Sequence, residues 1–395
     1  MKPFKFTVPQ DIVFGAGKMS ELPDLLAKCG SKNVLIISGR ILEKLGVVKK
    51  VSDTCFAQGI SVAAFLDVEP NPSTLTVNAA VEAYKANDCT AIVALGGGSP
   101  MDVAKAAGVL AMYGGSITEY EGADKVPGEI VPIIAIPTTA GTGSEVTAFA
   151  VITDQDRDYK LTVFSYKLLP RYALLDSELI RSLPPFVAAS TGVDAFIHAM
   201  EAYLSKDASP FSDAVGKEAM ELIGGNIREF VADRSNAEAA DAMMCGAMLA
   251  GIAFAWARLG NIHAMSHSVS AFYNVAHGIA NSVLMPAVLE FNAEADTGNR
   301  YEDIYNWLKP YSTPASEKFE KAMLVQVVRD LLKEFGLPGC LCEVKQIMDA
   351  GGSIDKNIDQ MATDAMKSGN VLTNPRATCK EDIIELYKIA MTALE

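Results

Sequence analysis

Three of the four histidines in this chain lie in one short stretch, GNIHAMSHSVSAFYNVAHGIANS, as His263, His267 and His277. The fourth, His198, follows Asp194 by four residues, and His263 and His267 have the same spacing. Residues four apart share one face of a helix, and imidazole and carboxylate groups are common ligands of divalent transition metals. A single histidine on an apolar helix face is usually a core residue. Two such pairs favour a metal site, without showing which histidine is left over.

Two glycine-rich loops are candidates for phosphate binding. In ALGGGSPMDVAK three glycines join an apolar strand pattern to a helical one, and glycines there let a backbone approach a pyrophosphate at a helix N-terminus. A plain tight turn is the alternative. The loop is neither a Walker A motif nor GxGxxG, and GAGKMS near the N-terminus lacks the last glycine of that motif. The second loop, IPTTAGTGSEVT, follows another strand, and together the loops indicate a dinucleotide across the strand ends.

The elements around these loops alternate. Apolar strand runs are expected at residues 33–38, 61–68, 90–95, 131–137, 147–154, 159–165 and 172–176, with helical patterns at 41–58 and after 73 and 99. Continuous apolar strands between helices predict a parallel sheet covered on both faces. After Pro184 and Pro185 the chain reads as helices. We therefore predict an α/β Rossmann-like domain over residues 1–184 and an all-α domain over residues 185–395.

Composition limits the class of protein. The 395 residues are 50% hydrophobic with a net charge of -14, which argues against nucleic acid or an anionic membrane as partner. An apolar run at residues 242–257 is short for a membrane span and is interpreted as a buried central helix. The seven cysteines are odd in number and include no CxxC pair, which is typical of reduced thiols in a cytoplasmic protein.

Four motifs in order resemble one known family. GGGSPMDVAK, PTTAGTGSEVT, GVDAFIHAMEAY and HAMSHSVSAFYNVAHGIANSVLMP are similar to the iron-containing, or group III, alcohol dehydrogenases. The resemblance extends to NPRATCKEDIIELYKIA near the C-terminus and implies the dehydroquinate synthase-like fold. It also implies homodimers or larger homo-oligomers, with Fe²⁺, or alternatively Zn²⁺, and NAD or NADP as cofactors.

The resemblance assigns roles to individual residues. It implies that the metal ligands are Asp194, His198, His263 and His277, and that His267 is a catalytic proton relay beside them. It implies that the residues that bind the dinucleotide are Gly39, Asn71, Gly97, Gly98, Ser99, Asp102, Thr138, Thr139, Thr142 and Lys160. Candidates for the substrate pocket are Phe149, Phe254 and Trp256, for which ordinary core packing is an equal alternative.

The chain departs from the family pattern at two places. Many members carry Asp where this chain has Gly39, and a carboxylate there would repel a 2′-phosphate. With Gly39 followed by Arg40, we predict that NADP(H) is accepted. The second departure is the sequence HSVS from His267, where many members have HPLG. The substrates of relatives are therefore a poor guide to the substrate of this protein.

The expected reaction is reversible hydride transfer between NAD(P)(H) and a small primary alcohol or diol, or the aldehyde. A polyol dehydrogenase or a dehydroquinate synthase-like lyase would use the same fold and cofactors. A metal-dependent hydrolase would leave the triple-glycine loop unexplained, and a non-catalytic dinucleotide sensor would not need a metal site.

Overall fold

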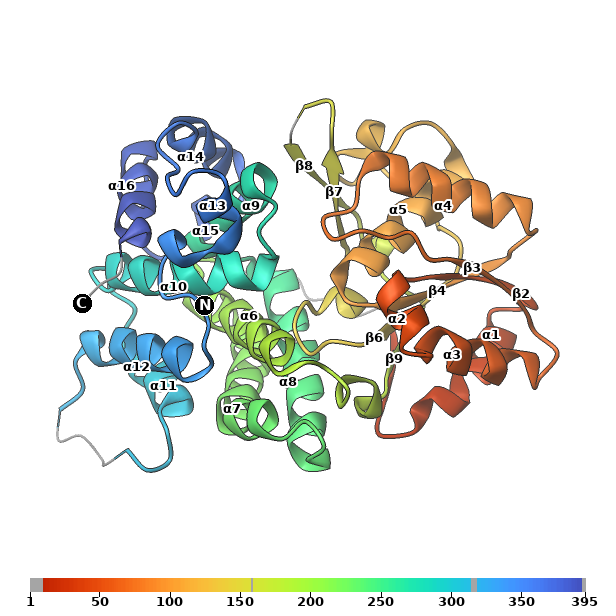
Figure 1. The fold of residues 1–395 in the computed structure, drawn as a ribbon, viewed down its shortest axis with the longest axis horizontal. Helices are drawn as coiled ribbons and strands as arrows, with labels where there is room; N and C mark the ends of the chain where they lie inside the picture. The colour runs from red at the N-terminus through yellow and green to blue at the C-terminus, as the bar shows by residue number, and fades with distance from the viewer. Residues whose placement is uncertain (1–9, 158, 314–317, 393–395) are drawn as a thin grey trace. The chain divides into compact units, whose positions relative to one another are not determined.

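The computed structural model describes residues 10–392, except residue 158 and residues 314–317. Within these residues the chain divides into two compact units (Figure 1). The first ends at Ser182 and the second begins at Leu183, close to the prolines at which the sequence predicts a boundary. The described part of the first unit is α/β and that of the second is helical, so the predicted fold class is correct.

The first unit is built on a six-stranded sheet with the order β1-β9-β6-β4-β2-β3. All its neighbouring strands pair in parallel, so their carboxyl ends share one edge. These strands are β1 (Asp11–Phe14), β2 (Asn33–Ile37), β3 (Ser61–Phe65), β4 (Ala91–Gly96), β6 (Ile133–Pro137) and β9 (Tyr172–Leu175).

The apolar runs are continuous because helices cover both faces of the sheet (Figure 1). In β2, Leu35 and Ile37 enter one core and Val34 and Ile36 enter the other. The first core includes residues of α4 (Thr74–Ala86) and α5 (Gly98–Tyr113), and the second includes residues of α1 (Leu22–Lys28) and α3 (Val47–Phe56). Alternate side chains are therefore buried on opposite faces of the sheet. These strands lack the alternating polar residues of a strand that is covered on one face only.

Three features of this unit differ from the sequence prediction. The predicted helix at 41–58 is two helices, α2 (Arg40–Lys44) and α3, because Gly46 between them has a φ of 76°. Strand β1 was not predicted. The strand runs predicted at residues 147–154 and 159–165 form β7 (Phe149–Asp154) and β8 (Tyr159–Phe164), which pair antiparallel with each other. They belong to a separate sheet, in which the short β5 (Gly122–Ala123) pairs parallel with β8.

The second unit is a helical assembly. Its helices are α6 (Pro185–Leu204), α7 (Pro210–Ala232), α8 (Ala237–Ala257), α9 (Asn261–Tyr273), α10 (His277–Asn292), α11 (Arg300–Leu308), α12 (Lys321–Glu334), α13 (Lys345–Asp349), α14 (Ile358–Lys367), α15 (Asn370–Thr373) and α16 (Lys380–Met391). By length and composition α8 is apolar enough to cross a membrane, but 56% of its apolar window is buried inside the protein. It packs against α6 and α7, as predicted for a central helix.

The cysteines differ from expectation at one pair. Cys340 and Cys342 are joined as a disulfide, with their Cα atoms 5.4 Å apart, because the short helical turn at Leu341–Glu343 brings the two side chains together. The expectation of thiols throughout is therefore wrong for this pair. Cys29, Cys55, Cys89, Cys245 and Cys379 are free.

Candidate functional site

Helix α6 carries two of the predicted ligands on one buried face. Asp194 and His198 are separated by one helical turn and are 2% and 4% exposed. The helix begins with Pro185 at its first position, where the missing N–H costs no hydrogen bond, and its apolar residues continue to Leu204. A carboxylate and an imidazole are therefore held rigidly inside the helical unit.

Helices α9 and α10 bring two further histidines to the same place. His263 lies in the first turn of α9, and His277 is the first residue of α10. Gly278 follows, and a Cβ on it would lie 2.6 Å from the carbonyl oxygen of Ser190 in α6. Only glycine permits this close packing of the two helices, which brings His277 to Asp194.

One potential ligand atom from each of Asp194, His198, His263 and His277 lies within 4.8 Å of the others. The His198 and His263 rings stack with centroids 4.5 Å apart. The amide nitrogen of Asn281 lies 2.6 Å from Asp194 Oδ1, 3.0 Å from His263 Nε2 and 3.1 Å from His277 Nε2. Potential ligand atoms of Asp194, His263 and His277 therefore all face the amide NH2 group of Asn281.

The electrostatics of this cluster suit a bound cation. Burial raises the pKa of the Asp194 carboxyl, and burial with the neighbouring histidines holds the pKa of His263 well below its usual range. His263 is therefore neutral, with a lone pair available for a metal. Within the described residues the ion pairs of Asp194 are with His263 and His277, at 3.9 and 4.0 Å, and not with a lysine or arginine. One carboxylate with three imidazoles is a donor set for Fe²⁺ or Zn²⁺, so these residues fit such an ion.

His267 lies one turn along α9 from His263, outside the group of four. Its ring stacks on that of His277 with centroids 5.5 Å apart, and it is partly exposed. The structure thus separates a group of four side chains from a neighbouring fifth, a distinction that spacing alone left open. Phe254 stacks on His198 with ring centroids 4.6 Å apart, whereas Phe149 packs on Phe164 of the α/β unit and Trp256 is partly exposed on α8.

In the α/β unit the two predicted loops follow the neighbouring strands β4 and β6. Helix α5 begins at Gly98, and its N-cap residue Gly97 provides no side-chain cap. A Cβ on Gly97 would lie 3.3 Å from Thr139 Oγ1, and one on Gly98 would lie 3.2 Å from Thr142 Cγ2, so glycines let the loops approach each other. The buried hydroxyl of Thr139 has no hydrogen-bond partner among the described residues. Uncapped N–H groups beside an unpaired hydroxyl suit an anion such as a pyrophosphate.

A buried lysine ties the second loop to α5. Lys105 is fully buried and donates to the Ser144 carbonyl at 2.7 Å and the Phe149 carbonyl at 2.8 Å. Asp102, predicted to bind the dinucleotide, accepts from Ser144 Oγ at 3.0 Å and Val151 N at 3.2 Å. Its carboxylate oxygens therefore hold the loop in place. Ser99 and Thr138 lie at the starts of the helix and the loop.

The remaining predicted cofactor residues lie just after β2, in the connection between β3 and α4, and on β8. Lys160 donates to Asn71 Oδ1 at 2.7 Å, and burial lowers its pKa to about 8. Gly39 pairs through a β-bridge with Asp67, which follows β3. Arg40, predicted to meet a 2′-phosphate, donates to Asp67 at 2.9 Å and Glu43 at 3.1 Å.

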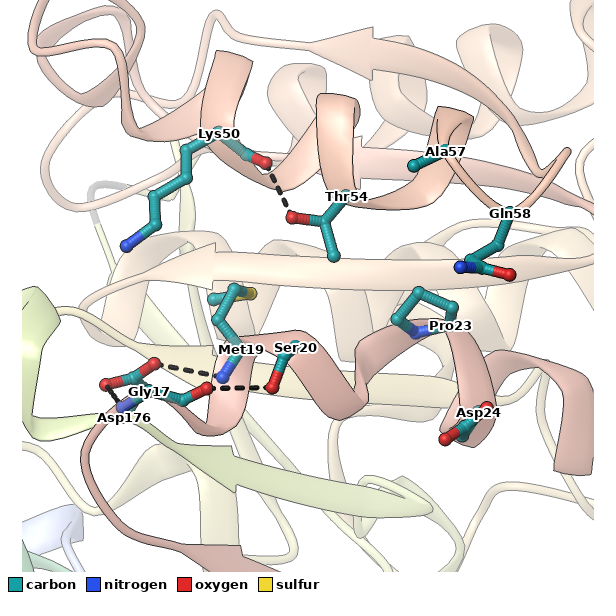
Figure 2. Close-up of a pocket in the computed structure, with 10 residues that line it drawn as sticks. All are labelled: Gly17, Met19, Ser20, Pro23, Asp24, Lys50, Thr54, Ala57, Gln58 and Asp176. Atoms are coloured by element: carbon teal, nitrogen blue, oxygen red, sulfur yellow. Dashed lines mark hydrogen bonds between the residues drawn. The ribbon is translucent and has the colours of Figure 1, made fainter.

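The GAGKMS turn leads to a different pocket, which Figure 2 shows. The N–H groups of Gly17 and Met19 both donate to Asp176, at 2.9 Å. The Asp176 carboxylate thus accepts hydrogen bonds from both N–H groups, as expected for an ordinary turn. None of the predicted cofactor residues lines this pocket.

Three side chains at these sites were not predicted. Glu201 bonds to His263, Asn281 contacts three members of the cluster, and Lys105 holds the second loop. A sequence signal exists for each: Glu201 is seven residues after Asp194, Asn281 is four after His277, and Lys105 is three after Asp102. Each spacing places the residue on a helix face that already carries a predicted site residue.

Comparison with known proteins agrees with these features. The model for "Iron-containing alcohol dehydrogenase" matches residues 9–177, and that for "Fe-containing alcohol dehydrogenase family, C-terminal" matches residues 188–391. The NAD-dependent methanol dehydrogenase of Bacillus methanolicus is 36% identical over 386 residues, 98% of this chain and 99% of that protein. The 1,3-propanediol dehydrogenase of Citrobacter freundii is 34% identical over 389 residues, 98% of each chain.

A solved structure gives the same result for the fold. The crystal structure of a 1,3-propanediol oxidoreductase superposes with a TM-score of 0.91 at 34% identity, covering 98% of this chain and 100% of that chain. The chain therefore belongs to the iron-containing alcohol dehydrogenase family, and it is a metal-dependent alcohol dehydrogenase or aldehyde reductase of that family.

Proposed function

We propose that this protein interconverts a small primary alcohol or diol and its aldehyde, with NAD(P)(H) as hydride carrier and ferrous iron, or alternatively zinc, as the metal. The observation that carries the proposal is the group of four side chains, Asp194, His198, His263 and His277, with ligand atoms within 4.8 Å of one another. When bound, the ion supplies Lewis acidity that lowers the pKa of the substrate hydroxyl, and the nicotinamide takes up or supplies the hydride.

The residues of this chain have separate tasks in that reaction. The group of four holds the ion, with one negative charge from Asp194 against the two positive charges of the metal. His267 is placed beside His277 and partly exposed, so it would accept the hydroxyl proton and pass it towards solvent. Phe254 covers His198 and keeps water from that side of the cluster.

The dinucleotide is held by the α/β unit in this proposal. N–H groups at the start of α5, in the segment Gly97–Ser99, would bind the pyrophosphate together with the hydroxyls of Thr138, Thr139 and Thr142. Strand β2 neighbours β4 in the sheet, so the adenosine ribose would extend towards Gly39. Lys160 and Asn71 would contact the cofactor further along, with Asp102 and Lys105 keeping the second loop in position.

We propose that NAD(H) and NADP(H) are both accepted. Gly39 presents no carboxylate to a 2′-phosphate, but Arg40 is paired with Asp67 and Glu43, and a phosphate must compete with these carboxylates. Asp67→Asn should therefore lower KM for NADPH and leave KM for NADH unchanged. Asp53→Asn is the matched control, because it removes the charge of another exposed pair, with Lys49. Equal changes in both variants would contradict the assignment.

The direct experiment is a panel of small aldehydes assayed with NADH and NADPH on metal-reconstituted protein. We expect reduction of at least one aldehyde and loss of that activity with a chelator. No turnover with any aldehyde or alcohol, in protein shown to contain metal, would contradict the proposal and favour a lyase on the same fold. The resemblance also implies a homo-oligomer, which light scattering at assay concentration tests, and the net charge of -14 favours a cytoplasmic location.

A further inference from the structure

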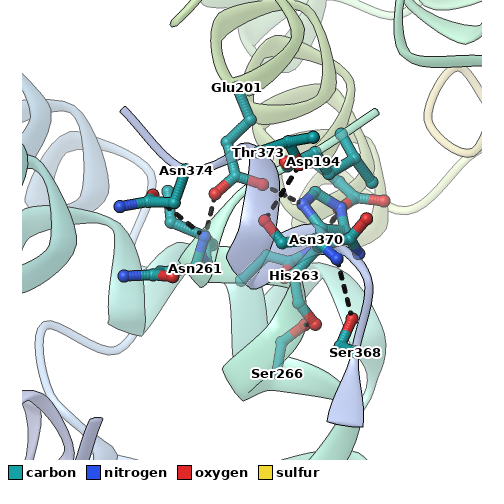
Figure 3. Close-up of polar contacts among 12 residues, drawn as sticks. Asp194, Glu201, Asn261, His263, Ser266, Ser368, Asn370, Thr373 and Asn374 are labelled. Atoms are coloured by element: carbon teal, nitrogen blue, oxygen red, sulfur yellow. Dashed lines mark hydrogen bonds and ion pairs between the residues drawn. The ribbon is translucent and has the colours of Figure 1, made fainter. Parts of the chain in front are cut away.

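Glu201 lies on the same face of α6 as Asp194 and His198, about one turn beyond His198, and is 5% exposed. Its carboxylate does not face the centre of the group of four. One oxygen accepts the backbone N–H of Ile262 at 2.8 Å, and the other lies 2.6 Å from His263 Nδ1 (Figure 3). Glu201 thus contacts the start of α9 and the far side of a proposed ligand.

The start of α9 is built to receive this carboxylate. The N-cap residue Gly260 provides no side-chain cap, so the first N–H groups of α9 need an acceptor from elsewhere. A Cβ on Gly260 would lie 2.9 Å from Glu201 Oε1 and 2.9 Å from Asn374 Oδ1. Glycine is required here for space, because the two acceptors from distant segments occupy the position of a side chain.

The contact with His263 decides which ring nitrogen carries the proton. A carboxylate that accepts from Nδ1–H leaves Nε2 as the nitrogen with a lone pair. Nε2 is the atom that faces Asp194 Oδ1, at 3.9 Å, and the centre of the group. The same hydrogen bond between Glu201 and His263 also fixes the orientation of the His263 imidazole ring.

We propose that Glu201 is a positioning residue that fixes the tautomer and orientation of His263 and so strengthens binding of the divalent cation. This inference rests on the proposed metal site. Substitution of such a hydrogen-bond partner typically weakens metal affinity about 10- to 100-fold. Glutamine at this position keeps the size but places an NH2 group against either the Ile262 N–H or His263 Nδ1–H, which are both donors.

The test is the affinity of apoprotein for Zn²⁺, measured by calorimetry, with the absorption spectrum of the Co²⁺-loaded protein as a second readout. Glu201→Gln should raise Kd about 10- to 100-fold and alter the Co²⁺ spectrum. Glu201→Asp keeps the charge and should recover part of the affinity. Asn374→Ala is the matched control, because it removes the acceptor of the neighbouring Asn261 N–H, at 3.2 Å, without touching His263.

The nitrogen NMR spectrum of the apoprotein reads the tautomer directly, since only four histidines contribute. At pH 9, above the pKa of about 8 to which burial raises Glu201, wild type should show His263, assigned with a His263→Gln variant, protonated at Nδ1, and Glu201→Gln should lose this preference. Unchanged affinity in folded Glu201→Gln, or an equal loss in Asn374→Ala, would overturn the inference. If Glu201→Gln fails to fold, Glu201→Asp with wild-type Kd and tautomer would overturn it instead. Wild-type protein that binds no metal would refute the proposed site itself, a distinct result.

Discussion

The two units of this protein each bury carboxylates, but they neutralise them differently. In the α/β unit, Lys105 supplies a positive charge beside Asp102 and Glu145, and backbone N–H and hydroxyl groups complete the network. In the helical unit, Asp194 and Glu201 are buried among histidines, and among the described residues their ion pairs are with those histidines.

This difference separates a structural network from the proposed metal site. Burying an ionised group is costly unless an opposite charge accompanies it. The α/β network carries its own cation and can hold a loop without a ligand. Burial raises carboxyl pKa values in both units, and in the helical cluster, where the described residues place no lysine or arginine in an ion pair with them, it raises that of Glu201 to about 8 and also raises that of Asp194. A divalent ion would supply the missing positive charge in the helical cluster, whereas Lys105 already supplies that charge in the α/β network.

The largest expected effect is that of Asp194→Ala. Removing the only carboxylate of the proposed ligand set should abolish tight metal binding, and activity should fall to that of the metal-free protein. Metal-free Asp194→Ala should nevertheless unfold at a urea concentration no lower than metal-free wild type, because the lost charge had no cation partner. Metal analysis, the aldehyde assay and urea unfolding check the three outcomes. Retained metal and full activity would refute the ligand set.

Lys105→Met should act in the opposite way on stability. It leaves Asp102 and Glu145 buried without their cation, so the free energy of unfolding should fall by about 3–5 kcal/mol. Lys49→Met is the control, because the exposed pair of Lys49 with Asp53 should contribute less than about 1 kcal/mol. A Lys105→Met variant no less stable than the control would show that the network does not depend on its lysine.

His267→Gln should separate proton transfer from metal binding. Turnover should fall about a hundredfold or more, since a positioned proton relay contributes that much, while the metal content stays that of wild type. Metal analysis and steady-state kinetics on the same sample check both parts. Loss of the metal would mean that His267 is a ligand and that the assignment of the group of four is wrong.

Glu145→Gln should give the smallest effect, and one that depends on pH. Burial raises the pKa of Glu145 to about 7 from an ordinary 4.5, so the folded protein holds this proton more tightly than the unfolded chain. The group's stabilising contribution is therefore present below pH 4.5 and is lost as pH rises to 7. The stability of Glu145→Gln relative to wild type should increase across this window by roughly 1 kcal/mol or more and then level off. A constant difference from pH 4 to pH 8, measured by urea unfolding, would contradict it.

Local pattern explains where prediction from sequence succeeded. The apolar runs of β2, β4 and β6 reflect burial on both faces, which any covered parallel sheet imposes on its strands. The runs of β7 and β8 have similar composition, but which sheet they join depends on partners far away in the chain. The break at Gly46 and the bond between Cys340 and Cys342 depend on backbone geometry that composition does not encode.

The sequence by itself determined the motifs: the i, i+4 ligand pairs, the two glycine-rich loops, and through their resemblance the family and the four candidate ligands. Only the tertiary structure decided which groups complete the sites. Glu201 reaches His263 across 62 residues, and Lys105 reaches Ser144 across 39. Periodicity specifies neighbours within one helix or strand, whereas these contacts arise where separate elements pack closely enough for their buried polar groups to meet.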